Sequence, residues 1–219
     1  MRTGEDVASS RIKLGDTAPD FVLSLALMNP QLRFLSFTIY SPIPGVNERL
    51  ANSSNEAIRR IVSDFLHHDN RSNEHWQVAA ADLTVDLLQE KIAALPSNVA
   101  LSLNSKCIFQ DASARYIPMM DFKPHPEPNS LKLLKGFLEE ISNGGIIVDS
   151  GASYHFFGFD FLDHKLWLEF IGKCLLTPWS DTRWIGHSLI EGGGGLRISA
   201  NESKQKLPSV CEVVGQGAR

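Results

Sequence analysis

Hydrophobic and polar residues recur along the chain with two different periods, and these periods predict where strands and helices lie. The stretch LRFLSFTIY is rich in β-branched and aromatic residues and predicts a strand over residues 32–40. Short apolar runs between turn residues predict further strands, two of them around the tight turn DSGA. The predicted strands lie within residues 32–40, 98–105, 116–122, 143–161, 195–200 and 209–214.

Apolar residues spaced by three and four positions predict amphipathic helices over 54–68, 76–95, 128–142, 162–176 and 181–190. Ser54 and Asp181 are the expected N-caps of the first and last of these helices, and Asn129 or Ser130 is the expected N-cap of the third. A break is expected near Asp82 in the second helix.

Strands and helices mix without strict alternation, and this order predicts an α+β fold rather than a doubly wound sheet. Residues 1–19 are polar and predict a flexible tail. The length of 219 residues then leaves a single domain over 20–215. We expect an N-terminal lobe at about 20–100 and a motif-bearing half at about 101–215.

Composition narrows the class of protein. Hydrophobic residues make up 43% of the chain and the net charge is −4, which excludes a uniformly basic nucleic-acid binder but not a local basic groove. Three widely separated cysteines, Cys107, Cys174 and Cys211, fit reduced thiols rather than a disulfide framework. The apolar stretch at 21–28 is far shorter than the ~20 residues that cross a membrane. We therefore expect a cytoplasmic protein with no membrane partner.

Polar residues occur where the apolar pattern does not require them. Asp121 ends a predicted strand, and Lys123 stands two residues later, where a second acid would share the same face. Alternation puts Ser153 and His155 together on one face of a later strand. The C-terminal run adds further charged and polar residues: Asp181, Arg183, His187, Arg197, Asn201 and Lys204.

Carboxylates, a histidine and several cations together suit a phosphorylated ligand. Carboxylates hold Mg²⁺ or Mn²⁺ through hard oxygen ligands, and arginine donates to phosphate oxygens, often bidentately. Transfer of a nucleotidyl group would use two metal ions, one on the attacking oxygen and one on the leaving group.

The order of these residues resembles the archaeo-eukaryotic primase superfamily, which includes the primase small subunit and the primase–polymerases. Its first motif is an acidic pair on a strand, and here MMDFK supplies Asp121 while Lys123 replaces the second acid. Its Ser-x-His motif matches Ser153 and His155 in SGASYHFFG. The resemblance covers roughly residues 100–215.

The C-terminal residues complete the resemblance. Asp181 corresponds to the acid of the third motif, while Arg197 and Lys204 match the basic residues that approach phosphates or template. The long spacing from Asp181 to Arg197, stretched by EGGGG, departs from the family's pattern.

The resemblance implies a primase-like core with an RRM-like antiparallel sheet flanked by helices, plus an N-terminal α/β lobe. It implies Mg²⁺ or Mn²⁺ held by Asp121 and Asp181, which with His155 would be the catalytic residues. Nucleotide phosphates would be bound by a further group of residues: Ser153, His155, Arg197 and Lys204.

Three functions remain open at this stage. The first is a metal-dependent nucleotidyltransferase of the DNA or RNA primase or polymerase type, which takes nucleoside triphosphates and a nucleic acid. The second is a catalytically inactive binding or regulatory module, in which Lys123 pairs with Asp121 in place of a metal. The third is a metal-dependent hydrolase that uses Asp121, His155 and Asp181. The sequence does not choose between DNA and RNA and does not indicate whether the protein has protein partners.

Each residue also has a purely structural alternative. Asp121 can be an ordinary strand-end residue, and His155 a core histidine bonded to the backbone. Arg197 alternates with Leu196 and Ile198, so it must leave the core face and can be a solvent-exposed strand arginine. Asp181 can be only a helix cap.

Overall fold

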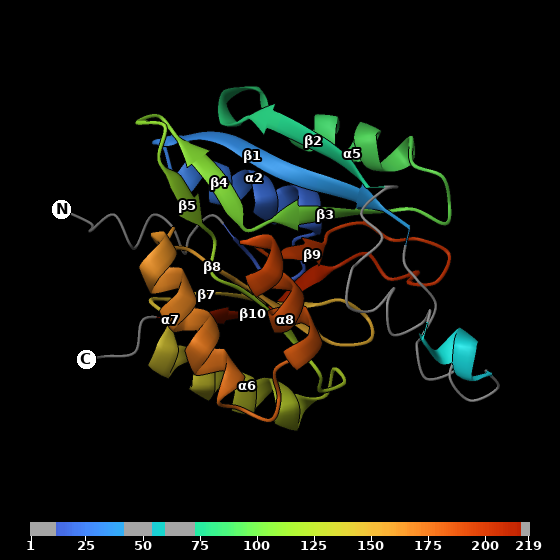
Figure 1. The fold of residues 1–219 in the computed structure, drawn as a ribbon. Helices are drawn as coiled ribbons and strands as arrows, with labels where there is room; N and C mark the ends of the chain where they lie inside the picture. The colour runs from blue at the N-terminus through green and yellow to red at the C-terminus, as the bar shows by residue number, and fades with distance from the viewer. Residues whose placement is uncertain (1–11, 42–53, 60–72, 216–219) are drawn as a thin grey trace.

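Two antiparallel sheets and the helices packed on them make up this α+β protein (Figure 1). The computed structural model describes residues 12–41, 54–59 and 73–215. Among these described residues, no helix is long and apolar enough to cross a membrane. The predicted fold class is confirmed.

The larger sheet has six strands and runs in the order β5-β4-β1-β3-β9, with β2 on the other edge of β1. Every pairing in it is antiparallel. Its strands are β1 (Leu32–Tyr40), β2 (Glu74–Ala79), β3 (Ala100–Asn104), β4 (Lys106–Phe109), β5 (Ala114–Tyr116) and β9 (Gly195–Arg197).

The smaller sheet has four strands in the order β10-β7-β8-β6, also antiparallel throughout. Its strands are β6 (Met119–Phe122), β7 (Gly145–Asp149), β8 (Tyr154–Gly158) and β10 (Ser209–Val214). The chain passes from β5 in one sheet to β6 in the other through Ile117 and Pro118. The predicted strands that carry Asp121 and His155 therefore belong to one sheet.

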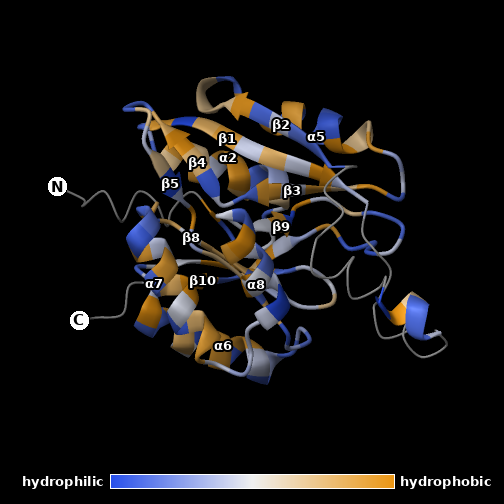
Figure 2. Ribbon diagram, viewed as in Figure 1, coloured by the Kyte–Doolittle hydropathy of each residue, from blue (hydrophilic) through white to orange (hydrophobic). Residues whose placement is uncertain are grey.

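Besides the helical residues 55–59, the described ranges hold five α-helices, and several of them begin at a capping side chain. Thr84, Asp163 and Asp181 each accept a backbone N–H with their side chains at the starts of α5, α7 and α8. The helices are α2 (Ala18–Met28), α5 (Val85–Ala93), α6 (Pro128–Ile141), α7 (His164–Leu175) and α8 (Thr182–Glu191). Figure 2 shows mixed hydrophobic and hydrophilic colouring around them, as expected of amphipathic helices.

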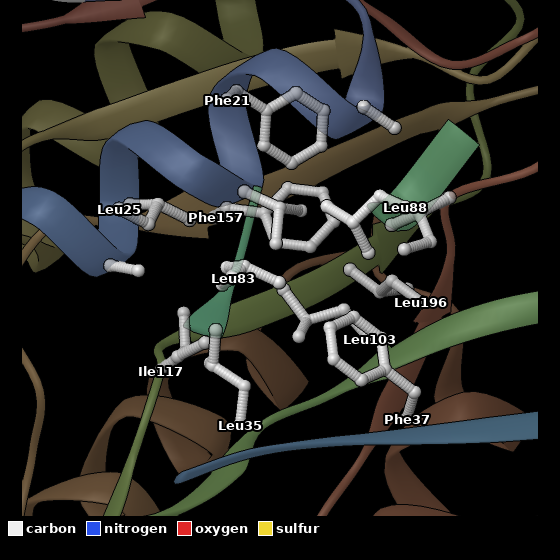
Figure 3. Close-up of a cluster of buried hydrophobic side chains, with 14 of the residues drawn as sticks. Phe21, Leu25, Leu35, Phe37, Leu83, Leu88, Leu103, Ile117, Phe157 and Leu196 are labelled. Carbon is white, nitrogen blue, oxygen red and sulfur yellow. The ribbon is translucent and has the colours of Figure 1, made fainter. Parts of the chain in front are cut away.

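Two apolar cores hold the layers together. The first joins the larger sheet, α2 and one face of the smaller sheet, and Figure 3 shows Phe21 of α2 beside Phe157 of β8 in it. Their ring centroids are 5.0 Å apart. The second core packs the other face of the smaller sheet against α6 and α7, through residues such as Phe156 and Trp167. The strands β7 and β8 are consequently buried on both faces.

Several predicted elements are confirmed closely, and others are wrong for identifiable reasons. The strand at Leu32–Tyr40 agrees to the residue. The helix expected over 76–95 is wrong in its first part, because Glu74–Ala79 pairs as β2 with β1, and a 3-10 turn at Ala80–Asp82 then leads into α5. The N-cap position of α6 is Glu127, before Pro128, rather than Asn129 or Ser130, and the Glu127 side chain makes no capping hydrogen bond.

Other segments were not predicted or lie partly outside the described residues. The helix α2 and the strand β4 had no predicted counterpart. Residues 55–59 are helical and Ser54 accepts the Ala57 N–H, but the rest of the predicted helix 54–68 lies outside the described residues. Residues 1–11 of the predicted tail also lie outside them, whereas Ile12 is buried and the Gly15 N–H donates to Val210 O at 2.8 Å.

Candidate functional site

The predicted Asp121 and His155 lie directly opposite each other on the paired strands β6 and β8. The hydroxyl of Ser153, at the start of β8, donates to Asp121 Oδ1 at 3.0 Å. His155 Nε2 lies 3.8 Å from the same oxygen, which is too long for a hydrogen bond. The first motif and the Ser-x-His motif therefore meet through one carboxylate.

The turn between β7 and β8 explains why Ser153 points to this carboxylate. Asp149 accepts the Gly151 N–H at 2.8 Å, and Gly151 has a φ of +98°, which a residue with a Cβ rarely adopts. The Ser150 N–H and hydroxyl both donate to Ser153 O, at 3.0 and 2.8 Å. These bonds fix the DSGA turn in a single arrangement around Ser153.

His155 is a buried, neutral histidine without a backbone hydrogen bond among the described residues. Its exposed fraction is 5%, and Nδ1 is buried with no partner in the part of the chain that the structure describes. Burial, followed by the charges of Arg197 and Lys204, lowers the pKa of His155 to about 3. The imidazole is therefore uncharged near pH 7, and its approach to Asp121 is not an ion pair. The alternative of a core histidine bonded to the backbone is wrong.

A second carboxylate lies beside Asp121. The Asp181 N–H donates to Asp121 O at 2.9 Å, and the Asp181 side chain caps α8 as predicted, accepting the Arg183 and Trp184 N–H groups with Oδ1. The Asp121 side chain keeps 26% of its surface exposed, but protein surrounds it elsewhere. Burial, and next the charge of Asp181, raise the pKa of Asp121 to about 7.

Arg197 brings a buried positive charge to this region from β9. Its exposed fraction is 7%, so the alternative of a solvent-exposed strand arginine is wrong. The guanidinium donates to three backbone carbonyls, those of Ser150 (2.6 Å), Lys206 (3.1 Å) and Ser199. Over the described part of the chain, no carboxylate lies within ion-pair distance of it. Arg197 is thus fixed in place, and its charge is not compensated by a salt bridge.

Lys204 adds an exposed positive charge next to the same groups. It lies in a tight turn, in which the Lys204 N–H donates to Asn201 Oδ1 at 2.7 Å. Its charge lowers the pKa values of both Asp121 and His155. The amide nitrogen of Asn201 is buried without a partner in the described residues. The predicted basic residues therefore do gather around the two motifs.

The carboxylates offer few ligands for a metal ion. Asp121 and Asp181 each use Oδ1 for hydrogen bonds, and within the described ranges Oδ2 of each has no partner. Two carboxylates fit one Mg²⁺ or Mn²⁺ whose other ligands are water and phosphate oxygens. No cluster of three or more histidines, cysteines or acids suited to a metal occurs among the residues described. The donor set thus fits one ion better than two.

Lys123 does not form the ion pair that the inactive-module alternative required. It is exposed beyond the end of β6, and its N–H donates to Trp179 O at 2.7 Å. In the described part of the chain, its ammonium contacts neither Asp121 nor another acid. Of the described acids, Asp149 and Asp160 do not replace the missing one either, because Asp149 pairs with Lys206 and Asp160 accepts from Asn143.

One neighbour of the site was not predicted. Tyr40, the last residue of β1, interacts electrostatically with both Arg197 and Asp121. Burial raises the pKa of its phenol, which stays protonated near pH 7. Tyr40 lies far before the motif-bearing half. In the sequence, only its position at the end of a predicted strand could have marked it as a neighbour of the site.

Comparison with known families identifies a related family. The family model described as AEP-like, archaeo-eukaryotic primase 1D-like, matches residues 79–209, which include Asp121, Ser153, His155, Asp181 and Arg197. Lys204 lies within the match as well, whereas Tyr40 lies outside it. Neither the curated proteins nor the solved structures give a significant match.

Proposed function

Because the chain belongs to the archaeo-eukaryotic primase 1D-like family, we propose that its site binds a nucleoside triphosphate for nucleotidyl transfer to a nucleic-acid strand. The fold is that of a primase-like nucleotidyltransferase. Nucleotide binding, metal dependence and transfer are the parts that this proposal adds.

The uncompensated charge of Arg197 carries the proposal. Burying a cation is costly unless an anion faces it, and the described residues give Arg197 carbonyl partners but no carboxylate. A triphosphate is an anion of the kind that arginine and lysine bind through charge-assisted hydrogen bonds. The guanidinium and Lys204 offer a triphosphate a complementary positive field, and the neutral imidazole of His155 adds an uncharged N–H donor.

The remaining residues have separable roles in this proposal. The neutral His155 donates one N–H to a phosphate oxygen, and Ser153 orients the carboxylate of Asp121. Asp121 and Asp181 hold the metal ion through their free oxygens. When bound, such an ion would neutralise charge that develops on the phosphate oxygens.

A binding module without catalysis is the second candidate, and Lys123 favours it. An acid is expected at this position of the motif, and with the exposed lysine there, the described residues offer the carboxylates of Asp121 and Asp181 alone for metal. Such a protein would bind the triphosphate and a nucleic acid but would not join them.

Binding of a fluorescent nucleoside triphosphate to wild type and to His155→Ala tests the proposal, in EDTA, in Mg²⁺ and in Mn²⁺. We expect binding that requires metal and is lost in His155→Ala. Metal-independent binding that is lost in the variant would favour the second candidate. Absence of binding to the wild type in all three conditions would overturn the proposed function.

Extension of a labelled primer by wild type and by Asp121→Asn then separates transfer from binding. Product with the wild type alone supports transfer. Metal-dependent binding without product supports the second candidate. Release of free phosphate without extension would instead indicate a hydrolase.

A further inference from the structure

The side chain of Tyr40 projects from the larger sheet on the same face as Arg197. In the antiparallel register, Thr38 lies opposite Ser102, and Ser102 lies opposite Arg197. Alternate residues of a strand share a face, so Tyr40 lies on that face one pleat beyond Thr38. The intervening residues, Ile39 on β1 and Leu196 on β9, point into the first core instead.

The Tyr40 hydroxyl is available to a ligand. Within the described residues it has no hydrogen-bond partner, and the side chain as a whole is half-buried. Ala100 is the residue opposite it on β3, so no long side chain stands between Tyr40 and the space beside Arg197. A half-buried phenol without a partner leaves one donor unused.

The charges of Arg197 and Asp121 indicate which kind of ligand group the Tyr40 hydroxyl could bind. Arg197 is the stronger electrostatic partner of Tyr40 and Asp121 the weaker. A ligand group between Tyr40 and Arg197 therefore sits against a cation and a neutral O–H donor, and phosphate oxygens are acceptors that satisfy both. Resting on the proposed function, we propose that the Tyr40 hydroxyl donates a hydrogen bond to a phosphate oxygen of the bound triphosphate.

This inference gives the N-terminal part of the chain a role in the site. Tyr40 lies outside residues 79–209, which the family model matches. The larger sheet would then supply phosphate donors from two strands, β1 and β9, and the smaller sheet would supply His155 and the carboxylate of Asp121. Ligand binding would in this way bridge the two sheets.

Binding of inorganic tripolyphosphate, ATP and adenosine to the full chain tests the inference, with Mg²⁺ held constant. Tyr40→Phe removes only the hydroxyl, and Tyr116→Phe is the matched control, because Tyr116 packs on Trp167 in the second core, away from the site. A hydrogen bond to a charged acceptor predicts about tenfold weaker binding of both anions to Tyr40→Phe. We expect no change for Tyr116→Phe, and an unchanged melting temperature for Tyr40→Phe.

The outcomes separate the possible failures. Equal weakening of tripolyphosphate and ATP supports the phosphate contact, which a purely structural role of the hydroxyl would not produce. Weakening of ATP and adenosine alone would place Tyr40 against the nucleoside and overturn the inference. Unchanged binding of both anions in Tyr40→Phe would overturn it while leaving the proposed function intact. Failure of the wild type to bind either anion would overturn both.

Discussion

The strands β6 and β8 have one apolar end and one polar end on the same face of the smaller sheet. At the apolar end, Met119 pairs with Phe157, both fully buried, and Phe157 packs on Phe21 of α2. At the polar end, Asp121 pairs with His155. The two pairs are only two residues apart, about 7 Å along the strand. The same pairing geometry therefore carries both the core and the candidate site.

The difference between the two ends concerns which groups find a partner inside the protein. At the apolar end, the side chains of Met119 and Phe157 have no hydrogen-bonding group to satisfy, so close packing alone stabilises them. At the polar end, a buried imidazole nitrogen of His155 has no partner among the described residues, and the pKa of Asp121 is raised. Such unsatisfied groups lower stability, and proteins usually retain them where a ligand completes the arrangement.

The largest expected effects on stability and binding come from replacing one side chain at each end by alanine. Phe157→Ala should lower the free energy of unfolding by about 3–5 kcal/mol, because it removes a ring from the centre of the first core. His155→Ala should cost about 1 kcal/mol or less, because the imidazole makes no hydrogen bond in the described residues, yet it should abolish nucleotide binding. Urea denaturation and nucleotide titration on both variants measure the contrast. Equal loss of stability in the two variants would show that both ends are simply core.

A second, pH-dependent effect on stability is expected from Asp121→Asn, which removes the unfavourable charge of the polar end. The folded pKa of about 7 exceeds the ordinary 3.8, so the contribution of Asp121 to stability is complete below pH 4 and is lost as the pH rises through 7. Without metal, a rise of the pKa from 3.8 to about 7, at about 1.4 kcal/mol per pKa unit, predicts that the variant gains up to about 4 kcal/mol relative to wild type between pH 4 and pH 8. It should also lose metal-dependent nucleotide binding.

Thermal unfolding in EDTA across this pH range measures the gain in stability. His155, whose pKa is lowered, has the opposite pH dependence, losing stability as the pH falls from 6.5 towards 3. Because His155 is present in both proteins, its effect cancels in the difference between variant and wild type. A stability difference that does not change with pH would mean that Asp121 titrates normally.

The sequence predicted the polar end well because its signals are local. Alternation alone put Ser153 and His155 on one face, and the order of motifs put Asp121 on a strand before them. Asp181 was recognisable as a cap because the capping acid precedes an apolar periodic run.

Features that depend on contacts between residues far apart in the sequence were not predictable in the same way. The segment Glu74–Ala79 contains residues compatible with a helix, and only its pairing with β1 makes it a strand. The buried Arg197 depends on the carbonyls of Ser150 and Lys206, 47 and nine residues away in the sequence, as well as on that of nearby Ser199. Tyr40 joins the site only through the register of β1, β3 and β9.

Restoring an acid at position 123 should strengthen metal binding at the polar end. Lys123→Glu returns a carboxylate to the face of Asp121 and removes a positive charge near the metal position, so we expect about tenfold tighter binding of Mn²⁺. Lys132→Glu, on the exposed surface of α6, is the charge-matched control and should change nothing. Titration of Mn²⁺ followed by its paramagnetic signal measures both variants. Equal affinity in both would mean that the side chain at position 123 does not reach the metal.

The smallest expected effect separates the two roles of Asp181. Asparagine caps helices about as well as aspartate, so Asp181→Asn should keep α8 and change stability by less than about 0.5 kcal/mol. The variant loses one carboxylate of the pair, so Mn²⁺ affinity should fall about threefold to tenfold, and the pKa of Asp121 should move towards its ordinary value. NMR titration of the Asp121 carboxyl reports the pKa, and thermal unfolding reports the cap. A loss of stability without any change in metal affinity would show that Asp181 serves the helix alone, and the polar end would then hold a single carboxylate for metal.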